Sequence, residues 1–311
     1  MSLPPLVVVT GPTGLGKTEV AVRLAARLPV EVVSADSRQV YQGMDIGTAK
    51  PTAAQRVAVP HHLIDVVRPD ESYHAARFRS DARNAIEAIA ARGRLPLVVG
   101  GTGLYIRALL RGLQPAPPAN PEVRHELRER ARQEGLAALH SWLTDVDPAA
   151  AARIHPRDSV RILRALEIHR LTGDPVGAPS HWRRGRPEWA LLFVGLTRSR
   201  PSLYRTLARR VERMVTEGLR AETERLLAAG YDPALPAMQG IGYRHFVKVI
   251  RGEWPEAQAL SLMKRDTTRY AKRQWTWFAR EPDLRWLDVE AVGGVAGAAE
   301  EVEKWIVQAG L

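Results

Sequence analysis

The chain has 311 residues, of which 45% are hydrophobic and 25% charged, a composition typical of a globular protein with one large domain or two modest ones. It contains no cysteine, which excludes disulfides and thiolate metal sites. The N-terminus lacks the layout of a signal peptide, and no apolar stretch reaches the roughly 18 residues that a membrane span needs. We therefore expect a soluble cytoplasmic protein with no membrane partner.

The charge balance is strongly basic, with 45 Lys and Arg residues against 34 Asp and Glu and a formal net charge of +11. Only six of the 45 cationic residues are Lys. Arg presents a planar set of donors that suits phosphate groups and stacks on bases, so a polyanionic partner such as nucleic acid is one interpretation. The alternative is a bias toward Arg codons combined with a solvated surface.

The first elements along the chain predict a phosphate-binding loop. Residues 6–10 form a short β-branched apolar run that indicates a buried strand, and apolar side chains at Val20, Leu24 and Leu28 indicate a helix over 19–28. Between them lies the pattern G-x-x-x-x-G-K-[ST], formed by Gly11, Pro12, Thr13, Gly14, Leu15, Gly16, Lys17 and Thr18. A strand, a glycine loop and a helix aim backbone N–H groups and a positive helix end at a phosphate chain. The motif predicts binding of a diphosphate or triphosphate, with Thr18 as a Mg²⁺ ligand.

Alternating strands and helices continue through the first 112 residues. The patterns predict strands over 30–34, 61–67 and 95–99 and helices over 73–92 and 104–110. Strands that alternate with helices favour a doubly wound, mainly parallel sheet. We therefore assign residues 1–114 to the first part of a P-loop NTPase-like α/β core.

The alternating pattern of strands and helices ends at the Pro-rich segment 114–121, which we interpret as a linker. Helices are predicted over 122–134, 135–143, 148–154 and 158–171, followed by a loop over 172–187 and a buried strand over 189–196. The remaining pattern predicts helices over 201–229, 240–251, 255–279 and 298–308 and a last strand over 284–287. This order predicts an α-helical insertion over 115–187 between two parts of one core, residues 1–114 and 188–311.

Two strand ends carry candidate catalytic residues. Asp36 follows the strand over 30–34, and ligands of open α/β sheets bind beyond the carboxyl ends of strands. There a carboxylate can bind Mg²⁺ or accept a proton, although Asp in a turn or helix cap is the plainer alternative. Thr102 follows another strand within a Gly-rich turn, where its hydroxyl can contact a phosphate or a reacting group, or simply cap the helix.

Two later segments are basic. Arg205, Arg209 and Arg213 recur at helical spacing with Arg210 beside them, and residues 264–278 interleave Lys and Arg with aromatic side chains. Cations can contact RNA phosphates while rings stack on bases. The alternative for the aromatic residues is an amphipathic helix whose apolar side packs inward. The nine His residues show no metal-ligand spacing, so we predict no structural metal site.

Eight motifs in order give the chain a family resemblance. They are GPTGLGKT at 11–18, SADSRQVY at 34–41, MDIGTAKP at 44–51, GGTGLY at 100–105, AARIHP at 151–156, RALE at 164–167, GIGYR at 240–244 and KRQWTW at 272–277. In these motifs the chain resembles the tRNA dimethylallyltransferases over roughly residues 6–287. The resemblance implies transfer of a dimethylallyl group from its diphosphate to the exocyclic N6 amine of the adenosine directly 3′ of the tRNA anticodon. It also implies Mg²⁺ and the tRNA anticodon stem-loop as partners, and we expect a monomer.

The resemblance further implies roles for individual residues. Asp36 matches the proposed general base, Thr102 a residue that helps position the amine, and Arg210 an Arg that clamps the diphosphate. Residues 11–18 would bind the diphosphate, with Thr18 on Mg²⁺. The implied tRNA contacts, which also include Asp36 and Thr102, are Ser37, Arg38, Gln39, Arg124, Val160, Arg161, Ile162, Leu163, Arg164, Gln239, Gly240, Ile241, Gly242, Tyr243, Arg244, Lys272, Arg273, Gln274, Trp275, Thr276, Trp277, Phe278 and Ala279.

Two other functions remain open from the residues alone. A small-molecule kinase would place ATP on the phosphate loop and use Asp36 as the base toward a hydroxyl. It explains residues 1–112 but not the basic helical insertion or the segment KRQWTW. A non-catalytic RNA-binding protein with a nucleotide switch is the other alternative, and Asp36 and Thr102 at strand ends argue against it.

Overall fold

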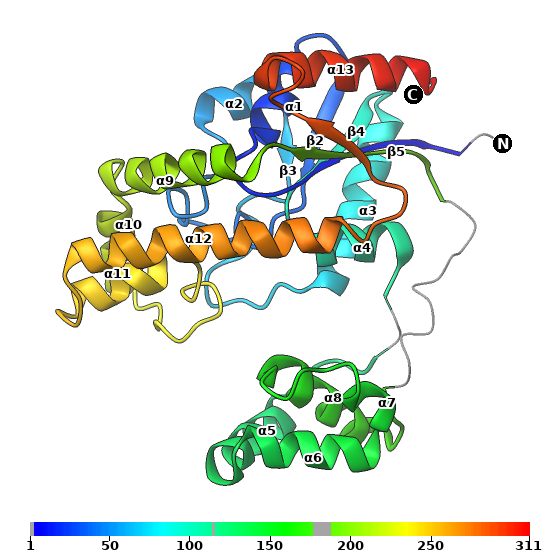
Figure 1. Ribbon diagram of the computed structural model, residues 1–311. Coiled ribbons are helices and arrows are strands. Elements are labelled where there is room, and N and C mark those ends of the chain that lie inside the picture. Colours follow the sequence, from blue (N-terminus) through cyan, green and yellow to red (C-terminus); the bar gives the residue numbers. More distant parts are fainter. Residues whose placement is uncertain (1–2, 114–115, 177–187) are drawn as a thin grey trace. The chain divides into compact units, whose positions relative to one another are not determined.

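The computed structural model describes residues 3–113, 116–176 and 188–311 (Figure 1). The chain divides into two compact units. We call Met1–Leu110 with Arg186–Leu311 the sheet unit and Arg111–Gly185 the helical unit. Residues 114–115 of the predicted linker and 177–187 of the predicted loop lie outside the described residues. No helix among the described residues is long and apolar enough to cross a membrane.

The sheet unit is built on six parallel strands in the order β3-β2-β4-β1-β5-β6. The strands are β1 (Pro5–Thr10), β2 (Val30–Ser34), β3 (His61–His62), β4 (Leu95–Val99), β5 (Ala190–Thr197) and β6 (Arg285–Asp288). Val8 of β1 is paired with Val98 of β4 on one side and with Phe193 of β5 on the other. The predicted parallel α/β sheet is confirmed.

The strand predicted over 61–67 is wrong in length. β3 ends at His62, because Leu63 and Asp65 adopt positive φ angles of 63° and 57° that turn the chain out of the extended conformation. Within residues 63–67 the only further β-type pairing is an isolated bridge between Val67 and Tyr41. The apolar run predicted a strand at this place in the chain but not its early end.

Helices cover both faces of the sheet. They are α1 (Lys17–Ala25), α2 (Ala53–Ala58), α3 (Ala75–Ala91), α4 (Gly103–Arg111), α9 (Arg200–Thr216), α10 (Leu219–Ala228), α11 (Tyr243–Ile250), α12 (Glu256–Phe278) and α13 (Gly294–Gln308). Alternate residues of β1 serve the two faces: Leu6 and Val8 pack in the core with α3 and α4, and Val7 and Val9 pack in the core with α1 and α13. The single helix predicted over 201–229 is broken at Gly218, whose φ of 102° is open to glycine and ends α9 before α10 begins.

The helical unit has a small core of its own. Its helices are α5 (Pro121–Glu134), α6 (Leu136–Val146), α7 (Pro148–Ala151) and α8 (Ser159–Thr172). Side chains of Asn120, Asp147 and Asp158 accept hydrogen bonds from the first turns of α5, α7 and α8 and so begin these helices. Leu127, Leu143 and other buried residues of the four helices pack together, so the predicted helical insertion is a compact body.

Candidate active site

The phosphate loop connects β1 to α1 in the conformation that its glycines allow. Gly11, Gly14 and Gly16 have φ angles of 124°, 86° and 78°, a region that other residues rarely adopt. A Cβ atom on Gly11 would lie 2.4 Å from the carbonyl oxygen of Leu196. The backbone conformation of the loop therefore requires these glycines. The loop leads directly into the N-terminus of α1.

Two cations, Lys17 and Arg210, lie beside this loop, and neither forms an ion pair with a carboxylate of the described residues. Nζ of Lys17 donates hydrogen bonds to the carbonyl oxygens of Gly11 at 2.9 Å and Pro12 at 2.8 Å. Burial and the nearby charge of Arg210 lower the pKa of Lys17 to about 7, although Asp36 acts in the opposite direction. Burial also lowers the pKa of Arg210, whose guanidinium forms no ion pair with any described residue. A bound anion would supply the missing counter-charge.

Two cavities of the sheet unit meet at these residues. The phosphate-loop cavity, of about 980 Å³, is lined by residues 13–14 and 16–19 of the loop and α1 and by much of the segment 42–56. The α11–α12 cavity, of about 270 Å³, is lined by Ser37 and Arg38, by the segment 239–244 and by α12. Both cavities are lined by Thr13, Lys17, Asp36, Arg210 and Met214. A ligand in one cavity would therefore face a ligand in the other at this shared wall.

Asp36 stands at the shared wall, directly beyond β2. One carboxylate oxygen, Oδ1, accepts hydrogen bonds from the backbone N–H groups of Arg38 at 2.8 Å and Gln39 at 3.4 Å. The other oxygen accepts none from the described residues. The turn interpretation of Asp36 is thus correct for one oxygen, and the other remains available to a ligand in either cavity.

Thr102 lies behind Asp36 and lines neither cavity. Its hydroxyl oxygen accepts a hydrogen bond from the backbone N–H of Ser37 at 3.0 Å, and its own N–H donates to the carbonyl oxygen of Ala35 at 3.2 Å. Its hydroxyl also donates a hydrogen bond to the hydroxyl oxygen of Ser37 at 3.4 Å. Thr102 therefore holds the chain on both sides of Asp36.

The four Arg residues of α9 that the helical spacing singled out divide into two groups, according to whether they line the phosphate-loop cavity. Arg210 and Arg213 line the phosphate-loop cavity. Arg205 and Arg209 are exposed and line none of the three cavities described here. Arg210 is separated from Arg213 by nearly one helical turn, which brings these two to one side of the helix.

Glu222 is a buried residue that sequence reasoning missed. Its carboxylate accepts hydrogen bonds from the backbone N–H groups of Asp45 at 3.0 Å, Ile46 at 2.9 Å and Gly47 at 3.1 Å. The hydroxyl of Tyr243 donates a further bond at 2.6 Å. Glu222 thereby fixes the loop whose residues 47 and 48 line the α11–α12 cavity. The only signal was a lone Glu in a helix, which has no distinguishing pattern.

The segment 239–244 forms a wall of the α11–α12 cavity. All of its residues except Gly242 line the cavity. Arg244 donates to Asp266 at 2.6 Å, and Tyr243 is buried with its hydroxyl on Glu222. The segment as a whole shapes the cavity, while the Tyr243 hydroxyl is already engaged inside the fold.

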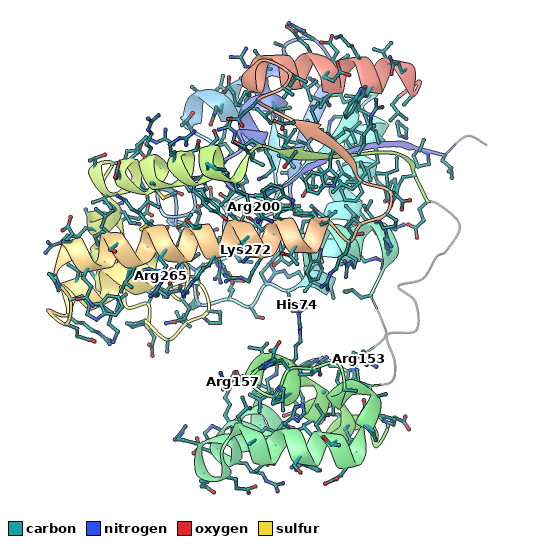
Figure 2. The ribbon with its side chains drawn as sticks, viewed as in Figure 1. His74, Arg153, Arg157, Arg200, Arg265 and Lys272 are labelled. Carbon is teal, nitrogen blue, oxygen red and sulfur yellow. The ribbon has the colours of Figure 1, made fainter. Side chains whose placement is uncertain are left out.

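The predicted RNA contacts of α12 fall on three sides of the helix. Gln274 and Phe278 are buried, and Arg107 lies 4.2 Å from the ring of the partly buried Trp277. Arg273 lines the α11–α12 cavity. A separate surface hollow of about 290 Å³ is lined by Arg200, Leu203, Tyr204, Lys272, Trp275, Thr276, Ala279 and Arg280, and Figure 2 shows Arg200 and Lys272 from α9 and α12 there.

In the helical unit the predicted contacts again divide into buried and exposed residues. Val160 is 77% exposed, and Arg161 is exposed as well, whereas Ile162 is completely buried in the core and Leu163 packs against it. Arg124 and Arg164 both pair with the buried carboxylate of Glu167, at 3.0 Å and 2.7 Å. Figure 2 shows two further cations of this unit, Arg153 and Arg157.

A metal ion would find few protein ligands here. Among the described residues no group of three or more His, Asp or Glu side chains could hold one. Thr18 lines the phosphate-loop cavity in the first turn of α1. This donor set fits Mg²⁺, which protein sites commonly hold by one or two ligands together with substrate phosphates and water.

A phosphate loop on a parallel sheet, with its cations facing a carboxylate at the next strand end, defines an α/β protein of the P-loop NTPase-like class. Within that class the chain belongs to the IPP transferase family, whose sequence profile matches residues 39–281. The profile of the isopentenyl transferases matches residues 4–61.

Named relatives agree over nearly the whole chain. The tRNA dimethylallyltransferase of Desulforudis audaxviator is 48% identical over 96% of each chain, and that of Geobacter sulfurreducens is 49% identical over 92% of each. The structure of the tRNA isopentenylpyrophosphate transferase from Bacillus halodurans has a TM-score of 0.71 and 40% identity, covering 98% of this chain and 96% of its own. A eukaryotic dimethylallyltransferase acting on tRNA has a TM-score of 0.76 and 27% identity, with 97% and 76% covered. The chain is accordingly a prenyltransferase.

Proposed function

We propose that this chain transfers the dimethylallyl group of dimethylallyl diphosphate to the exocyclic N6 amine of the adenosine 3′-adjacent to the anticodon of tRNA, and releases diphosphate. The observation that carries the proposal is the shared wall of the two cavities. There Lys17 and Arg210, which form no ion pair with the described residues, and Asp36, which has one carboxylate oxygen without a hydrogen bond from them, line both spaces. One cavity suits a diphosphate, and the other suits the nucleoside that receives its prenyl group.

The donor would bind in the phosphate-loop cavity. Backbone N–H groups of residues 14–18 would cradle the diphosphate, and Lys17 and Arg210 would neutralise the charge that gathers on it as it leaves. Thr18 would hold Mg²⁺, which adds positive charge at the leaving diphosphate when bound. Arg213, exposed at the same cavity, extends the positive wall.

The acceptor adenosine would enter the α11–α12 cavity. A base in a stacked loop is out of reach of the donor, so the nucleotide must be extruded from its stack. The N6 nitrogen attacks the C1 carbon of the donor, the bond from C1 to the diphosphate oxygen breaks, and the free oxygen of Asp36 accepts the N6 proton. Ser37 and Arg38, next to Asp36, line the same cavity and would hold the base.

The tRNA would be gripped by the exposed members of the predicted set. We assign Val160 and Arg161 of the helical unit, and Lys272, Arg273 and Thr276 of α12, to RNA contacts, and Ile162 and Phe278 to the packing beneath them. The helical unit would then clasp the anticodon stem-loop.

Mass spectrometry of unmodified tRNA tests the proposal after incubation with the protein, Mg²⁺ and dimethylallyl diphosphate. We expect a gain of one five-carbon prenyl unit, which fragment analysis places on the adenosine beside the anticodon. No gain, together with ATP consumption in the presence of small hydroxylated metabolites, would contradict the proposal and favour a kinase. Binding of tRNA should also weaken steeply with added salt, because contacts to phosphates release counterions.

A further inference from the structure

Gln274 joins two loops of the site from a third element, α12. Its Oε1 atom accepts a hydrogen bond from the backbone N–H of Thr13 at 2.9 Å, and its Nε2 atom donates to the carbonyl oxygen of Gly101 at 2.8 Å. The side chain is only 6% exposed. Thr13 belongs to the phosphate loop after β1, and Gly101 belongs to the turn after β4. One side chain therefore bridges two separate strand ends.

The chemistry of this bridge requires an amide. The Thr13 N–H can only donate and the Gly101 carbonyl can only accept, so the position needs an acceptor and a donor at the end of one side chain. An ionised Glu offers two acceptors and no donor, and Met offers neither. The turn also packs closely against the Gln274 amide. A Cβ atom on Gly101 would lie only 2.2 Å from Nε2, so only glycine fits there.

The two bridged loops position different groups of the shared wall. The phosphate loop carries Lys17 toward the phosphate-loop cavity. The turn after β4 carries Thr102, which holds the chain around Asp36 through Ser37. The separation of these two loops fixes how far a diphosphate on Lys17 lies from an amine on Asp36.

We infer that Gln274 is a positioning residue that sets the separation of donor and acceptor, an inference that rests on the proposed function. The sequence pattern placed Gln274 among the RNA contacts, but both polar atoms of its buried amide are held by the protein. Its exposed neighbours Lys272 and Arg273 remain on the surface of the same helix.

Steady-state kinetics of Gln274→Met tests this role, since Met preserves the side-chain length without the two hydrogen bonds. We expect kcat to fall about 10- to 100-fold, the effect of a small misplacement of reacting groups, while the KM for tRNA stays within about twofold. Gln274→Glu retains the bond from Thr13 but places an acceptor oxygen against the Gly101 carbonyl, so its kcat should fall at least as far as that of Gln274→Met. Gln258→Met is the matched control, because Gln258 is an exposed residue of the same helix and should show wild-type kinetics.

Several outcomes would overturn the inference. A raised KM for tRNA with unchanged kcat would make Gln274 an RNA contact, and wild-type kinetics in both Gln274 variants would leave the bridge without a role. Thermal unfolding is measured in parallel, and if Gln274→Met does not fold, the kcat of Gln274→Glu decides alone. If wild type and Gln258→Met both fail to prenylate tRNA, the proposed function itself is wrong, and this inference falls with it.

Discussion

The two units use their cations in opposite ways. In the sheet unit Lys17 and Arg210 line a cavity wall together with Asp36 but form no ion pair with the described residues, and burial lowers the pKa of both. In the helical unit Arg124 and Arg164 are also predicted RNA contacts, but both form ion pairs with the carboxylate of Glu167, which is fully buried. Lys17 and Arg210 are therefore available to a bound anion. Arg124 and Arg164 stabilise the helical unit through their ion pairs with Glu167.

This difference shows that a buried basic residue is a stronger candidate ligand for phosphate where it forms no ion pair with a carboxylate of the protein. Buried carboxylates mark the opposite case. Glu167 holds two Arg side chains and the N–H of Asn120, and Glu222 holds three backbone N–H groups and Tyr243. Both are structural anchors, one in each unit.

The largest expected effect is at Asp36. Asp36→Asn preserves an oxygen for the N–H groups of Arg38 and Gln39 but removes the base, so kcat should fall by ~10²–10⁴ while the KM for tRNA changes little. Rates measured at saturating tRNA check this. Asp36→Ala also loses the turn and should be no faster. A large loss of tRNA affinity with turnover retained would sink the assignment of the base.

A matched pair of substitutions separates the two classes of Arg. Arg210→Gln should lower kcat/KM for dimethylallyl diphosphate by ~10²–10³ with little change in stability, because it removes a charge-stabilising donor. Arg164→Gln should instead destabilise the helical unit, because it leaves the buried carboxylate of Glu167 with one Arg fewer. Kinetics and thermal unfolding on both variants check the contrast. If Arg164→Gln lowered kcat/KM for the donor as strongly, the distinction between the units would not hold.

Glu222→Gln tests the anchor of the sheet unit. An amide places its NH₂ group against backbone donors, so the free energy of unfolding should fall by about 1–3 kcal/mol. Denaturant unfolding measures this. The control Glu224→Gln, on the same helix but exposed and paired with Arg220, should cost less than about 0.5 kcal/mol. Equal losses in the two variants would show that the loop over 45–47 does not depend on Glu222.

The smallest expected effect is a pH dependence of diphosphate binding. Because the pKa of Lys17 is lowered to about 7, the free protein loses this charge as pH rises, and an anion must draw the proton back. Affinity for inorganic diphosphate should therefore weaken above pH 7 by at most about tenfold per pH unit, relative to Lys17→Arg, which stays charged. Calorimetry should also detect proton uptake on binding. An affinity ratio that does not change with pH would contradict a titrating Lys17.

Local patterns were sufficient for much of the fold. The phosphate loop, the strand over 30–34 that presents Asp36, and the helical unit followed from residue spacing and turn chemistry. The pattern did not predict α2, whose six residues bury no side chain and depend on the capping box of Thr52 and Gln55. Nor did it predict the break at Gly218, because helical periodicity continues on both sides of it.

Site residues that directly follow a strand could be predicted from the sequence. Residues whose role depends on contacts with distant parts of the chain could not. Asp36 was placed by its position at a strand end. The bridging role of Gln274 depends on Thr13 and Gly101, which are 261 and 173 residues away in the chain. In the segments 160–164 and 272–279, only the exposed residues can contact RNA. A motif that mixes polar and apolar residues does not indicate which of them are exposed.

A crystal structure with a tRNA anticodon stem-loop and an unreactive analogue of dimethylallyl diphosphate tests the central claim most directly. The claim is that donor and acceptor occupy the two cavities and meet at Asp36. It predicts the diphosphate within hydrogen-bond distance of Lys17 and Arg210, and the N6 amine of the extruded adenosine within hydrogen-bond distance of the Asp36 carboxylate. An adenosine that remains stacked in the RNA loop, or an amine held away from Asp36, would contradict it.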